Sequence, residues 1–401
     1  MQFKKVCLIT TGHISSNPRL LKEASSLSNA GYEVHIVFTQ YLEYLVAEDF
    51  KILSIHPDWK YSNFLWTPIK KTLRLKTALV QKITKWIYPL IRLNELIINR
   101  NYNWQLQRAI EIKADLYIAH NLGALPVAVN AAKANKTKCG FDAEDFHRNE
   151  ISDDVNSFDV RLKKYIEDEY LKEIDYFTAA SPLIANAYRE LYPQLNPVVI
   201  NNVFEIRNQP KINTNKNNVL KLFWFSQTIG RNRGLEDIIS ALNQIENPLM
   251  ELHLLGKLAI EDAKYFNKLA NFEIRYHKPV SPAQIFNLAS DFDLGLALEL
   301  NIPLNRNICL TNKIFTYLVS GLAILASNTA AQQDFLQENK NIGELYQIGN
   351  TKALADIITK LFNNREQLNE YKRNALESAK SKYNWEFEKQ KFIKIINKVI
   401  N

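Results

Sequence analysis

Short apolar runs alternate along this chain with longer segments in which apolar residues recur every three or four positions. The runs at residues 5–10, 34–39 and 114–120 have the length and composition of buried β-strands. A segment with helical spacing begins at Pro18 and is preceded by Asn17, a favoured N-cap residue. Strands that alternate with helices predict parallel sheets with right-handed crossovers.

The alternation occurs twice, and a polar segment separates the two occurrences. Residues 206–219 are rich in charged and amide side chains without periodicity, which is typical of a linker. We therefore predict two doubly wound, Rossmann-like α/β domains that face a cleft, with ligands beyond the carboxyl ends of the strands. The expected N-terminal domain covers residues 1–205 and the C-terminal domain residues 220–380. A final helix at 381–401 is expected to cross back to the N-terminal domain.

The segment at residues 310–325 raises the first question of chemistry. It reads LTNKIFTYLVSGLAIL, so the polar residues Thr311, Asn312 and Lys313 open an apolar helix that ends at Gly321. The free N–H groups and the dipole of a helix start favour an anion, and a lysine there adds positive charge. The alternative is that Thr311 only caps the helix and Lys313 is solvated.

The positive charge is concentrated in one segment. The chain has a net charge of +8, and the stretch from Lys60 to Ile110 contains ten Lys or Arg and a single Glu, a net charge of +9. The remainder is therefore close to neutral. Because no nucleic-acid-binding motif is present, a local basic segment on a neutral body indicates contact with a surface instead.

An insertion near residues 59–104 contains this basic segment. Within it, residues 67–91 have the pattern of an amphipathic helix, and four of the six tryptophans lie in or beside it. The basic residues opposite the apolar stripe are Lys70, Lys71, Arg74, Lys82 and Lys85. Basic, apolar and aromatic residues in this arrangement are typical of a helix on an anionic membrane surface. The alternative is that the stripe packs on the N-terminal core and the lysines are a solvated face.

Cysteine usage and targeting patterns favour the cytoplasm. Cys7, Cys139 and Cys309 lie far apart and have no metal-ligand spacing, as expected in a reducing compartment. Residues 1–12 read as a strand and its loop rather than a signal peptide, and no run of 18 apolar residues occurs. Together with the basic segment, these features predict a cytoplasmic protein that is peripheral on the inner face of a membrane.

Several stretches together resemble the family 4 glycosyltransferases of the GT-B fold. They are TTGHISSNPRLLKEASSLSNAGYEVHIV near the N-terminus, FDAEDF, FSQTIGRNRGLEDIISAL, TNKIFTYLVSGLAILAS and, near the C-terminus, SKYNWEFEKQKFIKII. The resemblance covers most of the chain except about residues 58–103. It implies transfer of a sugar from a nucleotide-sugar donor, usually with retention of configuration, without a bound metal or another cofactor. The expected acceptor is a lipid-linked or growing surface glycan.

The resemblance places the donor-binding residues on the C-terminal domain. Arg233 stands where the family often has a lysine, and Gly234 and a helix follow it, so a guanidinium and free N–H groups can face a diphosphate. Lys313, after Asn312, would approach the same anion as a point charge. Neutralising a leaving diphosphate is the electrostatic work that this reaction needs. Glu299, at the end of a predicted strand, could contact the donor sugar.

The chain departs from the family at several of these positions. Paired glutamates are expected at Ile308 and Thr316, and neither residue is a carboxylic acid. Thr316 would make only a weaker hydrogen bond to the donor ribose, which indicates an altered donor site. Thr228 replaces a frequent arginine, and we expect Arg231 to compensate for this missing phosphate cation.

The acceptor side is expected on the N-terminal domain. The candidate catalytic residues are His120, Asp142, Glu144 and Asp145. His120 follows an apolar strand directly, and the three acids share one predicted turn. An acid there could orient an acceptor hydroxyl or act as a base, and the alternative is a solvated acidic loop. His13 and Asn17, in the loop after the first strand, are candidate cleft residues.

Two other functions remain open at this point. A nucleotide-sugar epimerase would have the same two-domain architecture but would need no basic membrane segment. A non-catalytic glycosyltransferase-like partner protein would account for the missing glutamates. The expected ligands are a nucleotide-sugar, a glycan or lipid-linked acceptor and an anionic membrane surface, and no nucleic acid.

Overall fold

The computed structural model describes residues 4–65, 79, 82–83, 93–210, 218–245 and 247–400. The chain forms two compact units, of which unit 1 comprises Met1–Ile200 and Lys389–Asn401 and unit 2 comprises Asn201–Glu388. The predicted amphipathic helix lies mostly outside the described residues, as do residues 211–217 of the predicted linker. No described helix is long and apolar enough to cross a membrane.

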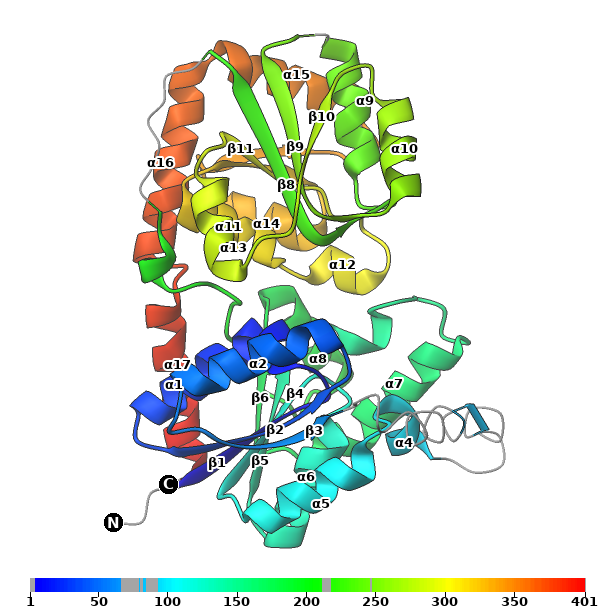
Figure 1. Ribbon diagram of the computed structural model, residues 1–401, viewed down its shortest axis with the longest axis vertical. Helices are drawn as coiled ribbons and strands as arrows, with labels where there is room; N and C mark the ends of the chain where they lie inside the picture. The colour runs from blue at the N-terminus through cyan, green and yellow to red at the C-terminus, as the bar shows by residue number, and fades with distance from the viewer. Residues whose placement is uncertain are drawn as a thin grey trace. The chain divides into compact units, whose positions relative to one another are not determined.

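Unit 1 is built on a seven-stranded parallel sheet in the order β3-β2-β1-β4-β5-β6-β7 (Figure 1). The strands are β1 (Lys5–Thr10), β2 (Glu33–Gln40), β3 (Lys60–Leu65), β4 (Leu116–His120), β5 (Lys138–Ala143), β6 (Tyr176–Ala179) and β7 (Val198–Val199). The helices are α1 (Pro18–Asn29), α2 (Glu43–Ile55), α4 (Asn94–Ile98), α5 (Tyr102–Ile112), α6 (Leu125–Asn135), α7 (Phe158–Tyr170) and α8 (Pro182–Leu191). The central strands are buried from end to end, as a sheet covered by helices on both faces requires.

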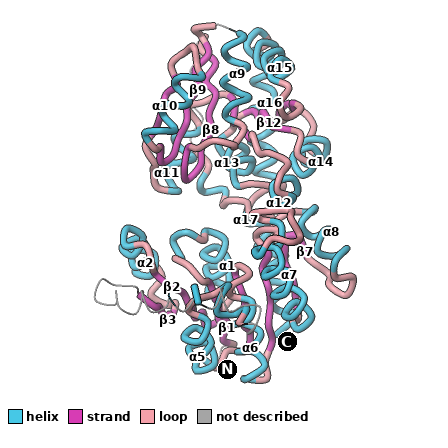
Figure 2. Tube along the Cα trace, turned by 90° about the vertical axis from the view of Figure 1, so that its right-hand side faces the viewer, coloured by secondary structure: helices cyan, strands magenta, loops and turns pink. Residues whose placement is uncertain are grey.

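Unit 2 repeats this architecture with a six-stranded parallel sheet in the order β10-β9-β8-β11-β12-β13. The strands are β8 (Leu220–Ile229), β9 (Met250–Leu258), β10 (Ile274–His277), β11 (Leu294–Ala297), β12 (Ala323–Ser327) and β13 (Gly343–Tyr346). The helices are α9 (Leu235–Ile245), α10 (Ile260–Leu269), α11 (Pro282–Ala289), α12 (Leu304–Ile308), α13 (Asn312–Ser320), α14 (Ala330–Glu338), α15 (Thr351–Asn363), α16 (Arg365–Ser381) and α17 (Trp385–Ile400). Helices cover both faces of the sheet (Figure 2).

Local sequence signals set several helix starts. The Asn17 side chain accepts a hydrogen bond from the Leu20 amide at 2.9 Å and caps α1. Ser181 caps α8 in the same way, and proline follows each cap residue. Thr311 does not cap α13 with its side chain, because its hydroxyl donates to Glu299 Oε1 at 3.2 Å instead.

Each sheet reverses its order beside its first strand, and this reversal positions the candidate sites. β1 pairs with β2 on one side and β4 on the other, and β8 pairs with β9 and β11. Since crossovers are right-handed, the connections on the two sides of β1, or of β8, leave toward opposite faces. The loops at the carboxyl ends of these strands therefore diverge and leave room for a ligand.

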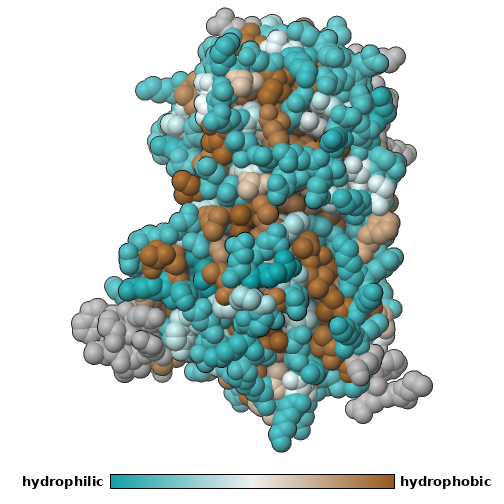
Figure 3. All heavy atoms as spheres, turned by 180° about the vertical axis from the view of Figure 1, so that it is seen from behind, coloured by the Kyte–Doolittle hydropathy of each residue, from teal (hydrophilic) through white to brown (hydrophobic). Residues whose placement is uncertain are grey.

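The helix α17 contributes to both units. Its first residues belong to unit 2, while residues from Lys389 onward belong to unit 1. Phe392 and Ile396 are fully buried, and Asn397 accepts a hydrogen bond from the Tyr32 hydroxyl at 2.5 Å. The face of the molecule drawn in Figure 3 is largely hydrophilic, with apolar patches between the hydrophilic residues.

Candidate functional site

The candidate site of unit 2 lies at the carboxyl ends of β8 and β11. A loop leads from Ile229 to α9, and Gly234 in this loop has a φ of +76°. A Cβ atom on Gly234 would lie 2.3 Å from the Leu298 carbonyl oxygen, so only glycine permits this approach. The close contact brings Arg233 beside the end of β11, where Glu299 lies.

Arg233 and Arg306 place two guanidinium groups near each other in this site. Arg233 Nη1 donates to Ser226 Oγ at 2.6 Å, and Arg306 Nη1 donates to the Asn232 carbonyl at 3.3 Å. Partial burial and the neighbouring Arg306 lower the pKa of Arg233. Like charges held together at the end of a sheet create a positive potential that favours a bound anion.

Lys313, the second residue of α13, forms an ion pair with Glu299. Its Nζ atom lies 2.5 Å from Glu299 Oε1 and 5.6 Å from the centroid of the Trp224 ring. Gln332 Nε2 donates to the other carboxylate oxygen of Glu299 at 2.9 Å. Burial alone would raise the pKa of Glu299, but Lys313 outweighs it and the pKa is lowered. Glu299 is therefore an ionised residue that fixes the position of Lys313.

Two of the predicted donor-binding residues do not line this site. The Arg231 guanidinium pairs with Asp262 at 3.2 Å and lies 4.3 Å from the centroid of the Tyr265 ring, so it is directed toward α10 and does not compensate for the missing cation. Thr316 is buried, and its hydroxyl donates to the Asn312 carbonyl at 2.8 Å. The Thr316 hydroxyl proton is therefore used within α13, and the expected bond to a ribose stays a prediction. Asn312 itself is exposed at the start of α13.

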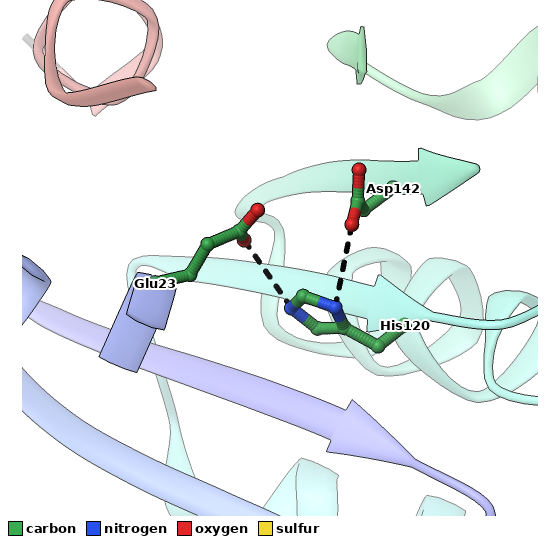
Figure 4. A group of neighbouring side chains, drawn as sticks. All are labelled: Glu23, His120 and Asp142. Carbon is green, nitrogen blue, oxygen red and sulfur yellow. Dashed lines mark ion pairs between the residues drawn. The ribbon is translucent and has the colours of Figure 1, made fainter. Parts of the chain in front are cut away.

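In unit 1, the predicted catalytic residues His120 and Asp142 lie inside a buried charged cluster (Figure 4). His120 Nε2 lies 3.3 Å from Glu23 Oε2, and His120 Nδ1 lies 3.5 Å from Asp142 Oδ2. Arg19 donates two hydrogen bonds to Asp142, from Nε to Oδ2 and from Nη2 to Oδ1, the second at 2.6 Å. Its Nη1 atom donates to the Ile200 carbonyl. These four side chains are buried, so His120 and Asp142 are not exposed to an acceptor in this conformation, and their catalytic role stays a prediction.

The same cluster brings together three possible metal ligands, Glu23, His120 and Asp142. The two carboxylates flank opposite nitrogens of one imidazole ring, whereas a metal ion is bound through one ring nitrogen. Arg19 also occupies both oxygens of Asp142 with a fixed positive charge. The arrangement fits a protonated histidine held between carboxylates better than it fits a bound cation.

The pKa of His120 agrees with that assignment. Burial alone would lower this pKa, but Glu23, Glu144 and Asp142 outweigh it and raise it to about 10. The neighbouring carboxylates thus favour the protonated form of His120, which disfavours a role as a base. Arg19 and Glu23 were missed in the sequence, although both fall on the face of α1 that carries Leu20, Ala24 and Leu27. Charged residues on the apolar face of a helix were the sequence signal that could have indicated a buried ion pair.

Glu144 is an accessible member of the acidic turn and lies beside this cluster. Its side chain is 24% exposed, Oε1 accepts a hydrogen bond from Asn17 Nδ2 at 2.8 Å, and His120 Nδ1 lies 3.6 Å away. Burial would raise the pKa of Glu144, but His120 outweighs it and the pKa is lowered. Asp145 is also partly exposed. Asn17 thus has two roles, as the cap of α1 and as the support of Glu144.

His13 has a structural position instead of the expected open one. It is buried, with Nδ1 2.6 Å from Asp49 Oδ2, and its Nε2 accepts hydrogen bonds from the Tyr41 and Leu42 amides. Both ring nitrogens are therefore used within unit 1. The expectation that His13 is a cleft residue is wrong for this conformation.

Two Rossmann-like units with these strand orders have the GT-B architecture of glycosyltransferases, and the comparisons agree. Residues 231–393 match the family described as glycosyl transferase-like. No curated protein matches the chain in sequence. These findings support a glycosyltransferase, and the match covers Arg233 and Lys313 but not the buried cluster of unit 1.

Solved structures from three organisms resemble the whole chain. Anabaena Alr3699/HepE, in complex with UDP and glucose, has a TM-score of 0.71 and 15% identity over 98% of this chain and 100% of its own. TarM from S. aureus, as a variant with fondaparinux, α-GlcNAc-glycerol and UDP, has a TM-score of 0.70 and 14% identity, covering 98% of this chain and 100% of its own. A Listeria monocytogenes protein assigned as a UDP-N-acetylglucosamine 2-epimerase has a TM-score of 0.63 and 13% identity, covering 99% and 96%.

Proposed function

We propose that this protein is a glycosyltransferase that moves a hexose from a nucleotide-sugar to a lipid-linked or growing surface glycan. The observation that carries the proposal is the cationic site of unit 2, where Arg233 and Lys313 stand at the starts of α9 and α13. A leaving nucleoside diphosphate develops charge that such groups stabilise. The Anabaena protein of the same fold was solved with UDP and glucose. Membership of family 4, retention of configuration and metal independence are parts of the proposal that rest on the sequence resemblance.

The test is a nucleotide-sugar assay with two readouts. Purified protein is incubated with UDP-, GDP-, ADP- and dTDP-sugars, with and without a lipid extract of the source cells. Release of a nucleoside diphosphate that depends on the extract, with label transferred to lipid, supports the proposal. Formation of an epimeric nucleotide-sugar without extract would establish the epimerase instead. Neither product with any donor would favour the non-catalytic partner protein, a candidate kept because Ile308 and Thr316 stand where glutamates were expected.

On the acceptor side, Glu144 is proposed as the residue that orients or deprotonates the attacking hydroxyl. Glu144→Gln is expected to lower the transfer rate by about 10²-fold or more, because positioned acids and bases typically contribute 10²–10⁴. Binding of the nucleoside diphosphate to unit 2 should be unchanged. Glu190→Gln, at an exposed position of α8, is the control and should retain full rate. Equal transfer rates in the two variants would contradict the proposed role of Glu144 and favour the alternative of a solvated acidic loop.

The protein is proposed to be cytoplasmic and to bind the inner face of an anionic membrane through its basic segment. Each basic residue near such a surface contributes roughly 1 kcal/mol, so five suffice for reversible binding. Changing Lys70, Lys71, Arg74, Lys82 and Lys85 to Gln should abolish co-sedimentation with anionic liposomes, and salt should weaken wild-type binding. The control changes five exposed lysines of unit 1, namely Lys51, Lys113, Lys133, Lys164 and Lys172, and so removes the same charge. Equal binding to neutral and anionic vesicles would contradict the proposal.

A further inference from the structure

We propose that Arg306, supplied by α12, is a third phosphate-binding cation of the donor site and contacts the diphosphate directly. The inference rests on the proposed function, because it assigns a residue to the same site. No sequence pattern pointed to Arg306, which stands alone in the polar segment between β11 and α13. The structure brings it to the loop that carries Arg233.

A hydrogen bond from the Arg306 side chain to the backbone of that loop fixes the position of its guanidinium. Its Nη1 atom donates to the carbonyl of Asn232, the residue directly before Arg233. Asn232 has a φ of +57° and Gly234 a φ of +76°, so the loop turns sharply on both sides of Arg233. Arg306, from α12, and Arg233, from the loop before α9, thus lie at the same loop.

The site has an excess of positive charge that a bound anion would neutralise. Lys313 is paired with Glu299, and a second carboxylate, that of Glu236, accepts a hydrogen bond from the Asn232 amide at 3.2 Å. Among the described residues, neither Arg233 nor Arg306 forms an ion pair, and their hydrogen bonds go to the Ser226 hydroxyl and the Asn232 carbonyl. Neither guanidinium is therefore paired with a carboxylate of the described residues, and the three cations of the site outnumber its two carboxylates. A nucleoside diphosphate offers two phosphate groups, and each guanidinium can bind phosphate oxygens through two parallel hydrogen bonds.

Arg231 provides a matched comparison within the same loop. It is two residues from Arg233, but its guanidinium is paired with Asp262 and lies over Tyr265. Removing its charge should therefore leave the anion site intact. Because Arg231 is paired with Asp262 and Arg306 is not paired with a described carboxylate, the phosphate-binding role is inferred for Arg306 and not for Arg231.

The experiment measures nucleotide affinity by calorimetry in the full-length protein. The probe is whichever of UDP, GDP, ADP and dTDP binds the wild type, together with its monophosphate. For Arg306→Gln we expect diphosphate affinity to fall about tenfold, the loss of a charge-assisted hydrogen bond, while monophosphate affinity changes much less. Arg306→Lys should retain part of the affinity, and Arg231→Gln should stay within about twofold of the wild type, because its surface ion pair contributes little.

A double variant separates direct binding from positioning. If Arg306 touches phosphate itself, Arg233→Gln combined with Arg306→Gln should bind the diphosphate more weakly than Arg233→Gln alone. If Arg306 only holds the loop, the double variant should equal the Arg233→Gln variant, and the inference is overturned. It is also overturned if Arg306→Gln binds the diphosphate as tightly as the wild type while Arg233→Gln does not. Failure of the wild type to bind all four diphosphates would instead refute the proposed function, and the inference with it.

Discussion

Arg19→Met should lower the free energy of unfolding by about 3–5 kcal/mol, the usual cost of leaving a buried charge without its partner. Arg19 is fully buried and binds both oxygens of Asp142, and its Nε lies 3.7 Å from Glu23. Without it, Asp142 would lose the two hydrogen bonds that Arg19 donates, while His120 would stay beside both buried carboxylates. The measurement is urea denaturation followed by tryptophan fluorescence.

Arg189→Met is the control for this change. Arg189 is exposed on α8 in the same unit, and its guanidinium donates a hydrogen bond to Asn186 Oδ1 at 2.8 Å. It should change stability by less than about 0.5 kcal/mol. Combining Arg19→Met with Asp142→Asn should recover part of the loss, because both members of the buried pair are then uncharged. Equal urea midpoints for the Arg19 and Arg189 variants would show that the cluster contributes nothing to stability.

Lys313→Met should weaken binding of the nucleoside diphosphate by at least about tenfold, since a charge-assisted contact is worth roughly 1.5–3 kcal/mol. It should also destabilise unit 2, because Glu299 would keep its burial and lose its cation. Lys313→Arg retains the charge and tests whether binding needs only a cation. Lys360→Met is the control, because Lys360 forms an exposed ion pair with Glu344 in the same unit.

The stability loss of Lys313→Met has a predictable pH dependence. In the wild type the pKa of Glu299 is lowered below its usual 4.5, so its contribution to stability is present above that pH and is lost as the pH falls through the folded-state pKa. In the variant burial remains and the neighbouring cation is lost, so the pKa of Glu299 should rise. The difference in unfolding free energy should therefore be full near pH 7 and shrink as the pH falls through 4.5 and below. A difference that is constant between pH 7 and pH 4 would contradict the role given to the ion pair.

The repeating strand and helix pattern was predictable from the sequence because each element carries its own signal. The helix predicted from Pro18 to about Asn29 is confirmed, and its start is set by the Asn17 cap. The strands expected at residues 34–39 and 114–120 are confirmed as Glu33–Gln40 and Leu116–His120, with ends that differ by at most two residues. Apolar composition alone does not determine how many residues pair with a neighbouring strand.

The site was less predictable because charge does not reveal burial. His120 and Asp142 lie at strand ends, as expected, but Arg19 and Glu23 come from another element and enclose them. Arg231 and Arg233 were both expected to bind phosphate, and the contacts of Arg231 with Asp262 and Tyr265 on α10 separate their positions. Such distinctions depend on contacts between segments far apart in the chain.

The division of α17 between the units has a consequence for synthesis on the ribosome. Phe392 and Ile396, which unit 1 buries, are translated only after all of residues 201–388. At about 5–20 residues per second, that delay is roughly 10–40 s. During this time the N-terminal unit lacks two core side chains and exposes the apolar surface that they later cover. We therefore expect nascent chains to be open to chaperones and proteases until the last helix has emerged.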